Sequence, residues 1–246
     1  HYNMINKIVA DIPTALADIP DGATILVSGF GNAGNPTDLM HGLIDQGARE
    51  LTVINNNAGN GHVGLAALLE AERARKIVCS FPRSRDPVVF ETLYRAGKIE
   101  LETVPQGTLA ERIRIAGAGI GGFYTPTSVG TPLAEGKEER VIDGRRMVLE
   151  SPLHADYALI KAWKADRWGN LIYRRAAQNF APLMAMAAKT TIVQVQHVVE
   201  LGEFEAESVD TPGIFVDRVV HVPEPLDEDA MYAADKAQRE QAAGKS

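Results

Sequence analysis

The chain has 246 residues, of which 45% are hydrophobic and 23% charged, and its formal net charge is −7. This balance is typical of a globular protein with a sizeable core, and the acidic excess argues against nucleic acid or an anionic membrane as a partner. No apolar run approaches the roughly 20 residues of a membrane-spanning helix. The single cysteine, Cys79, excludes an internal disulfide, favours a cytoplasmic location and is expected to be a buried, inert thiol.

Hydrophobic periodicity predicts alternating strands and helices in one domain over residues 4–222, preceded by a cloning remnant at 1–3. The expected helices cover residues 8–19, 36–47, 62–72, 87–96, 108–116 and 182–188. The expected strands cover residues 23–28, 51–54, 76–79, 100–104, 120–123, 190–195 and 213–221. Hairpins are expected over 136–149 and between 158–162 and 171–173. This order predicts an α/β fold, a mostly parallel sheet with helices on both faces plus a small antiparallel hairpin region.

The C-terminal segment from residue 223 to 246 is polar, acidic and rich in alanine. A helix and a disordered tail are both compatible with that composition. In either case we expect the segment to lie outside the core.

The most informative stretch of the first half is a glycine-rich turn between an apolar run and a helix start. The turn is formed by Ser28, Gly29, Phe30, Gly31, Asn32, Ala33 and Gly34. Pro36 suits the first helical position, Asn35 is expected to cap the helix, and Asp38 complements the helix dipole. We expect backbone N–H groups of this turn to be free for an anion or a developing oxyanion. A purely structural role, in which the glycines only permit a tight strand–helix turn, remains an alternative.

The spacing Gly29-x-Gly31-x-x-Gly34 also matches the dinucleotide-binding fingerprint. That fingerprint needs an acidic residue about 20 positions further on, at the end of the second strand, to bind the ribose hydroxyls. Here the second strand leads into Asn55-Asn56-Asn57, and no carboxylate stands at its end. The sequence therefore disfavours NAD binding.

A second candidate site follows the strand at 100–104. Thr108 and Glu111 have the spacing of a capping box, which predicts a helix from Leu109 and leaves Gln106 at the carboxyl end of the strand. A primary amide at that position is a neutral donor that could hold an oxyanion, although a bond to neighbouring backbone is equally compatible. Polar residues that follow strands should gather on the same edge of the sheet: Asn32, Asn55, Asn56, Arg83, Arg85 and Gln106.

The attacking group of an active site is missing from these patterns. The histidines are too scattered for metal-ligand spacing, so we expect no metal site, and no serine or cysteine nucleophile motif occurs. The sequence thus predicts a half-site, which offers anion and oxyanion donors without a nucleophile.

Several blocks of the chain resemble the first, or α, subunit of family I CoA-transferases. They lie at residues 21–36, 56–59, 93–98, 105–112, 152–156 and 166–171, so the resemblance extends from about residue 5 to 218. One departure is Ser28, which stands where the family commonly has a glycine.

The resemblance implies transfer of CoA from succinyl-CoA to a 3-oxo acid in the breakdown of aromatic compounds, with 3-oxoadipate as the expected acceptor. The nucleophile is a glutamate in a Ser-Glu-Asn-Gly motif of a β subunit, which this sequence lacks, so we expect a β-subunit partner, with two copies of each chain. Gln106 corresponds to the oxyanion-hole glutamine, and residues 28–34 correspond to the CoA-binding turn. CoA is then a substrate, and no tightly bound cofactor is expected. The alternatives are an acetoacetate-type transferase subunit, an acyl-CoA hydrolase and a non-catalytic CoA-binding module.

Overall fold

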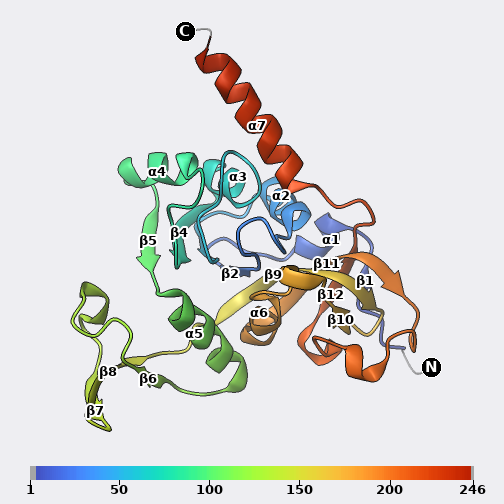
Figure 1. The fold of residues 1–246 in the computed structure, drawn as a ribbon. Helices are drawn as coiled ribbons and strands as arrows, with labels where there is room; N and C mark the ends of the chain where they lie inside the picture. The colour runs from blue at the N-terminus through green and yellow to red at the C-terminus, as the bar shows by residue number, and fades with distance from the viewer. Residues whose placement is uncertain (1–3, 245–246) are drawn as a thin grey trace.

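The computed structural model describes residues 4–244, so the remnant expected at 1–3 lies outside the described residues. Its main sheet has nine strands in the order β1-β12-β11-β9-β2-β3-β4-β5, with β10 paired to β9 (Figure 1). These strands are β1 (Ile8–Val9), β2 (Thr24–Val27), β3 (Leu51–Ile54), β4 (Ala74–Cys79), β5 (Glu100–Thr103), β9 (Ala155–Asp166), β10 (Leu171–Ile172), β11 (Ala188–Val199) and β12 (Arg218–His221). Every pairing along this order is parallel, and only β10 runs antiparallel to its neighbour. The expected parallel sheet is confirmed.

Helices cover both faces of the sheet because the strands alternate their apolar side chains between two cores. In β2, Ile25 and Val27 belong to one core and Leu26 to the other. The first core contains residues of α1 (Ile12–Leu16), α2 (Thr37–Gln46), α3 (Leu65–Glu70) and α4 (Val88–Arg95). The second contains residues of α5 (Gln106–Ala118) and α6 (Ala181–Ala187). Short 3₁₀ turns lie at Pro132–Ala134, Arg175–Ala177, Ala206–Ser208 and Gly213–Phe215.

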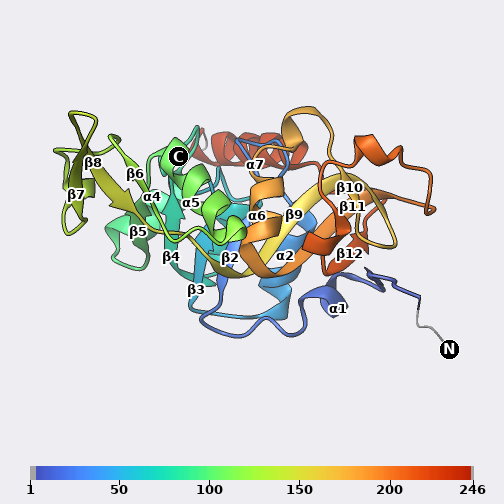
Figure 2. The same cartoon turned by 90° about the horizontal axis from the view of Figure 1, so that it is seen from below.

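A three-stranded antiparallel sheet stands at one end of the molecule, apart from β12 at the other end (Figures 1 and 2). Its order is β6-β8-β7, from β6 (Phe123–Thr125), β7 (Glu139–Ile142) and β8 (Arg145–Glu150). Asp143, with a φ of +50°, and Gly144 form the turn between β7 and β8, as expected from the Asp-Gly pair. The second expected hairpin is confirmed as β9 and β10.

Three element boundaries differ from the expectations. The helix expected at 8–19 is a strand followed by a short helix, because the side chain of Asp11 accepts from the Thr14 N–H and Pro13 lies in the first turn. The strand expected at 120–123 is displaced, since α5 continues to Ala118 and ends at Gly119 in the left-handed conformation. Within 213–221, only Arg218–His221 is a strand.

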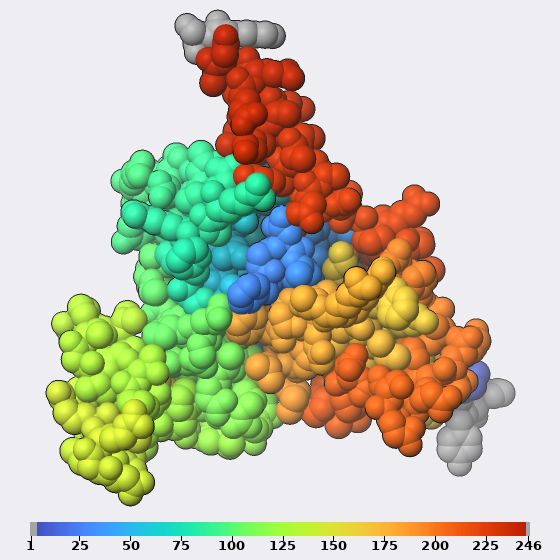
Figure 3. Space-filling model, viewed as in Figure 1, coloured from blue at the N-terminus to red at the C-terminus, as the bar shows by residue number. Residues whose placement is uncertain are grey.

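The C-terminal segment forms the helix α7 (Glu228–Ala243), whose first turns contact the body while its end projects from it (Figures 1 and 3). Tyr232 of α7 is 7% exposed, and α7 contributes no residue to the two apolar cores. Helix rather than disorder is therefore what the structure has for this segment. None of the helices within residues 4–244 combines the length and apolarity that crossing a bilayer requires.

Candidate active site

A cavity of about 370 Å³ lies at the carboxyl edge of β2, β3 and β4, where the sequence placed the polar turn residues. Its polar lining comes from Asn32, Asn56, Asn57, Asn60, Ser84 and Gln106. Its aromatic lining comes from Phe30, Phe81 and Tyr232. Gly31 and Arg85 complete it. The expected gathering is thus confirmed for Asn32, Asn56, Arg85 and Gln106, whereas Asn55 and Arg83 do not line the cavity.

Gln106 is the first residue of α5, so its side chain reaches the cavity from the helix start. The expected capping box is wrong, because the helix begins three residues before Leu109, at Gln106, and Thr108 is buried inside its first turn. The Gln106 Nε2 donates to Asn56 Oδ1 at 2.9 Å. Since an amide nitrogen carries two hydrogens, this bond fixes the side chain and leaves one N–H for a ligand.

Asn56 is itself held in place. Its Oδ1 also accepts from Ser80 Oγ at 2.6 Å, and the residue is 5% exposed. The neighbouring Asn55 is buried and donates from Nδ2 to the Val27 carbonyl at 2.8 Å. Asn57 accepts from the Gly59 N–H at 2.8 Å. The three asparagines after β3 therefore fasten adjacent turns to one another, and Asn56 orients Gln106.

The turn at 28–34 divides into an inner and an outer part. Ser28 is fully buried, and its Oγ donates to the Gly34 carbonyl at 2.8 Å, so this side chain faces away from the cavity. Phe30, Gly31 and Asn32 line the cavity. Gly29, Ala33 and Gly34, like Ser28, lie outside its lining and support the turn.

The expectation of free backbone N–H groups is wrong for half of this turn. The Gly29 N–H donates to Asn179 Oδ1, and Phe30 and Ala33 exchange N–H···O bonds with each other. Asn179 fills the space beside the turn and also donates to the Ala33 carbonyl at 2.9 Å. Gly29 must be glycine, because its φ is +131° and an added Cβ would lie 1.7 Å from the Asn35 side chain.

The start of α2 is occupied by a carboxylate of the chain itself. Glu228 of α7 accepts from Asn35 Nδ2 at 2.9 Å and from Thr37 Oγ1 at 2.5 Å. Asn35 therefore does not cap the helix as expected: Pro36 is the residue before its first turn, and the Asn35 amide points to Glu228 and to the Gly31 carbonyl. A dinucleotide would need this position for its pyrophosphate, so the structure also disfavours NAD binding.

The two candidate arginines differ in their surroundings. Arg83 is mostly exposed and pairs with Glu91 at 3.3 Å, outside the cavity. Arg85 lines the cavity, and its guanidinium lies 5.5 Å from the centre of the Tyr232 ring. Cys79 is buried as expected, and burial raises the pKa of its thiol to about 12, which keeps it protonated at neutral pH.

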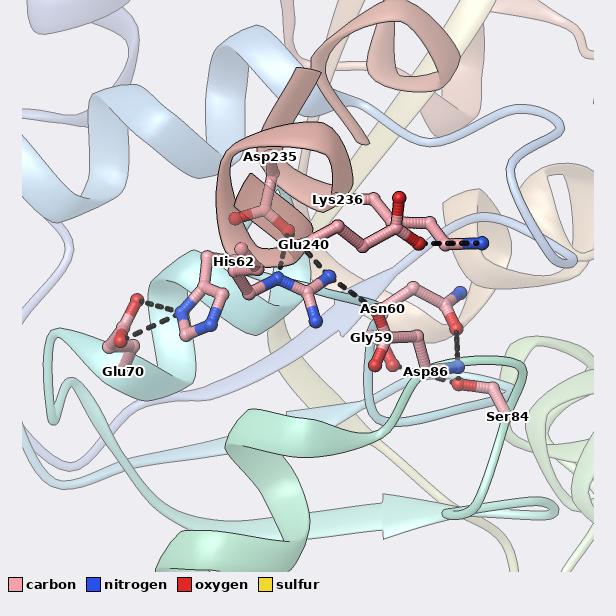
Figure 4. A network of polar contacts seen from close by, with 10 residues as sticks. Gly59, Asn60, His62, Glu70, Ser84, Asp86, Asp235, Lys236 and Glu240 are labelled. Atoms are coloured by element: carbon pink, nitrogen blue, oxygen red, sulfur yellow. Dashed lines mark hydrogen bonds and ion pairs between the residues drawn. The ribbon is translucent and has the colours of Figure 1, made fainter. Parts of the chain in front are cut away.

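A polar network fastens α7 to the loops that surround the cavity (Figure 4). Asn60 Oδ1 accepts from Ser84 Oγ and from the Asp86 N–H, both at 2.9 Å. Arg239 of α7 pairs with Asp86 and with Asp235. Asn57, Asn60, Phe81 and Ser84 were missed from the sequence although they also follow β3 and β4, so the same rule could have found them. Tyr232 carried no such signal, because its place depends on how α7 docks.

The fold and site define an α/β protein with a ligand cavity on the carboxyl edge of a parallel sheet. Among the described residues, those that line this cavity offer amide donors but no carboxylate, thiol or imidazole. The family model for coenzyme A transferase matches residues 9–222, and the chain therefore belongs to the coenzyme A transferase family. The resemblance drawn from the sequence is confirmed.

Curated relatives match over nearly their whole length. The chain is 67% identical over 219 residues to the first subunit of 3-oxoadipate CoA-transferase from Pseudomonas putida, which covers 89% of this chain and 95% of the relative. It is 60% identical to the same subunit from Acinetobacter baylyi, over 89% of this chain and 96% of the relative. The first subunit of a probable succinyl-CoA:3-ketoacid coenzyme A transferase from Bacillus subtilis is 46% identical, over 88% and 90%.

Solved structures show the same fold at low identity. Glutaconate coenzyme A-transferase of Acidaminococcus fermentans superposes with a TM-score of 0.82 at 19% identity, over 94% of this chain and 83% of that chain. The acyl-CoA transferase YdiF of Escherichia coli O157:H7 gives 0.79 at 24% identity, over 90% of this chain and 48% of that chain. This chain thus corresponds to about half of YdiF.

Proposed function

We propose that this chain is the α subunit of a transferase that moves CoA from succinyl-CoA to a 3-oxo acid, with 3-oxoadipate as the preferred acceptor. The observation that carries the proposal is the amide of Gln106, fixed by Asn56 and exposed to a cavity without a nucleophile. The curated relatives from P. putida and A. baylyi, which bear the name of that activity, support the choice of acceptor.

The proposed reaction needs a glutamate from a β subunit, since the resemblance implies that this group attacks the thioester carbonyl. The glutamate carboxylate forms a C–O bond, negative charge develops on the carbonyl oxygen, and the free N–H of Gln106 donates to that oxygen. Collapse expels the CoA thiolate and leaves an acyl-glutamate anhydride. The thiolate then attacks the glutamyl carbonyl, which releases succinate and leaves glutamyl-CoA for the acceptor.

CoA is a substrate in this scheme, and no tightly bound cofactor is needed. Phe30, Gly31 and Asn32 are the turn residues best placed to contact it, since they line the cavity. We further propose an assembly of two α and two β chains in the cytoplasm, a location in keeping with one unpaired, buried cysteine.

The test of the proposed function mixes the purified α and β chains with succinyl-CoA and 3-oxoadipate and follows the new thioester. We expect transfer by the pair and none by the α chain alone. Transfer by the α chain alone would contradict the half-site, and CoA release without acceptor would indicate hydrolysis instead.

Replacing Gln106 by alanine tests the oxyanion donor. We expect kcat of the assembled enzyme to fall by about 10²–10³, the usual effect of losing one such donor, while the amount of α–β complex stays unchanged. Gln238→Ala is the matched control, because Gln238 lies on the exposed side of α7, away from the cavity. An unchanged kcat for Gln106→Ala would remove this role.

A further inference from the structure

The cavity beside Gln106 has a single source of charge. Of the described residues that line it, Arg85 alone carries a charge, and the others are aromatic, amide, hydroxyl or glycine residues. Arg85 forms no ion pair with any described carboxylate, and its guanidinium rests on the face of the Tyr232 ring. An unpaired guanidinium in an otherwise neutral cavity is suited to an anionic ligand group.

The loop that carries Arg85 is fixed on both sides of it. Ser84 Oγ donates to the Gly59 carbonyl at 2.8 Å, and the Asp86 N–H donates to Asn60 Oδ1. The Asp86 carboxylate, which could otherwise neutralise Arg85, is held by Arg239 of α7 (Figure 4). The guanidinium is therefore presented at the cavity on a rigid loop and remains available to a ligand.

We propose that Arg85 binds the carboxylate at the non-reacting end of a dicarboxylic acyl group, and so selects dicarboxylic over monocarboxylic 3-oxo acids. This inference rests on the proposed function. Succinyl-CoA and 3-oxoadipate each carry a second carboxylate besides the carbonyl that reacts, whereas acetoacetate carries none. With the reacting end beside Gln106, the second carboxylate needs a cation within the same cavity, and Arg85 is the cation the chain supplies.

Tyr232 acts as a positioning residue for Arg85. The ring lies against the guanidinium and restricts it without using its hydrogen-bond donors, as expected for a cation–π contact. This contact gives α7 a part in substrate selection, although the helix lies outside the residues 9–222 that the family model matches.

The experiment compares acceptors with the assembled α–β enzyme. In a ping-pong exchange, kcat/KM for the acceptor reports only the second half-reaction, so one donor serves for every acceptor. For Arg85→Gln we expect kcat/KM for 3-oxoadipate to fall roughly 10- to 100-fold, the effect of losing one charge-assisted hydrogen bond, while kcat/KM for acetoacetate stays within twofold. Tyr232→Phe, which keeps the ring, should behave as the wild type.

Arg83→Gln is the matched control, because it removes the same charge from the same loop outside the cavity. Inhibition by succinate, with butyrate as its monocarboxylic counterpart, is a second readout that needs no turnover of acetoacetate. Arg85→Gln should weaken inhibition by succinate and leave inhibition by butyrate unchanged.

Equal losses of kcat/KM for both acceptors, or no loss for 3-oxoadipate, would overturn the role of Arg85. A wild-type pair that transfers CoA to neither acceptor would instead contradict the proposed function. The two failures are therefore distinguishable.

Discussion

Glu228 is a carboxylate whose protonation is linked to folding. Burial raises its pKa, and the bonds from Thr37 and Asn35 oppose that rise only in part. A raised pKa in the folded state means that the native protein holds this proton more tightly than the unfolded chain does. The native state therefore loses stability as pH rises from the ordinary glutamate pKa, about 4.3, through the folded pKa.

Replacing Glu228 by glutamine should remove this pH dependence. The amide keeps one acceptor for Asn35 and can donate to Thr37, and it carries no charge to bury. We expect Tm of Glu228→Gln, measured between about pH 4.5 and pH 7, to fall less with rising pH than Tm of the wild type. Glu240→Gln, an exposed position on the same helix, should reproduce the wild-type profile; parallel profiles for all three proteins would contradict the linkage.

Single residues of the site were predictable where chain order alone determines their place. Gln106 and Asn56 follow parallel strands, so their position on one edge of the sheet could be stated from the sequence. Asn35 shows the limit, because its side chain was expected to cap α2 and is instead engaged by Glu228, which is distant in sequence. Ranking Arg85 above Arg83 likewise required knowing where Glu91 and Tyr232 lie.

At the scale of elements, α7 is held by its side chains at a few points. Glu228, Tyr232 and Arg239 face the body, while most of the remaining residues of the helix are exposed. Arg239 bridges the helix and the loop before α4 through Asp86, which makes it the outermost fastening point along the chain.

Loss of that bridge should loosen the end of α7 before it affects the sheet. For Arg239→Gln we expect faster amide hydrogen exchange over residues 236–243 and a loss of about 1 kcal/mol in the free energy of local opening, since the partners are partly buried. Lys236→Gln, which removes only a long contact with Glu240, is the control. Unchanged exchange in Arg239→Gln would show that α7 is held elsewhere.

Element type followed from periodicity, and the errors lie at ends where capping decides. Alternating apolar residues in β2 and β3 indicated buried strands correctly, because both faces of the sheet are covered. The first helix was placed too early because Asp11 and Pro13, its actual start signals, lie inside the apolar run that suggested a longer helix. The docking of α7 has no local signal, since its composition also suits a free tail.

At the scale of the whole molecule, the two sheets differ in how much apolar surface they bury. Within the described residues of β6, β7 and β8, only Val148 and Glu150 are buried, whereas β2, β3 and β11 lie in the main cores. Small antiparallel sheets with so little burial have low local stability.

We therefore expect amide exchange in the isolated chain to be at least about tenfold faster in β7 and β8 than in β2, β3 and β11. Exchange monitored by mass spectrometry at neutral pH measures this difference. Equal protection of both sheets would mean that the small sheet is stabilised by contacts other than apolar burial.

The pairing of β1 with β12 has a consequence for how the protein is made. The first strand of the chain completes one edge of the sheet, yet its partner is the last strand, so Ile8 and Val9 have no neighbour until the chain is synthesised as far as Val220. The N-terminal strand must wait on the ribosome, while β2 to β5 can already assemble in order. Release of the finished chain, rather than emergence of its beginning, sets the moment at which the sheet is complete.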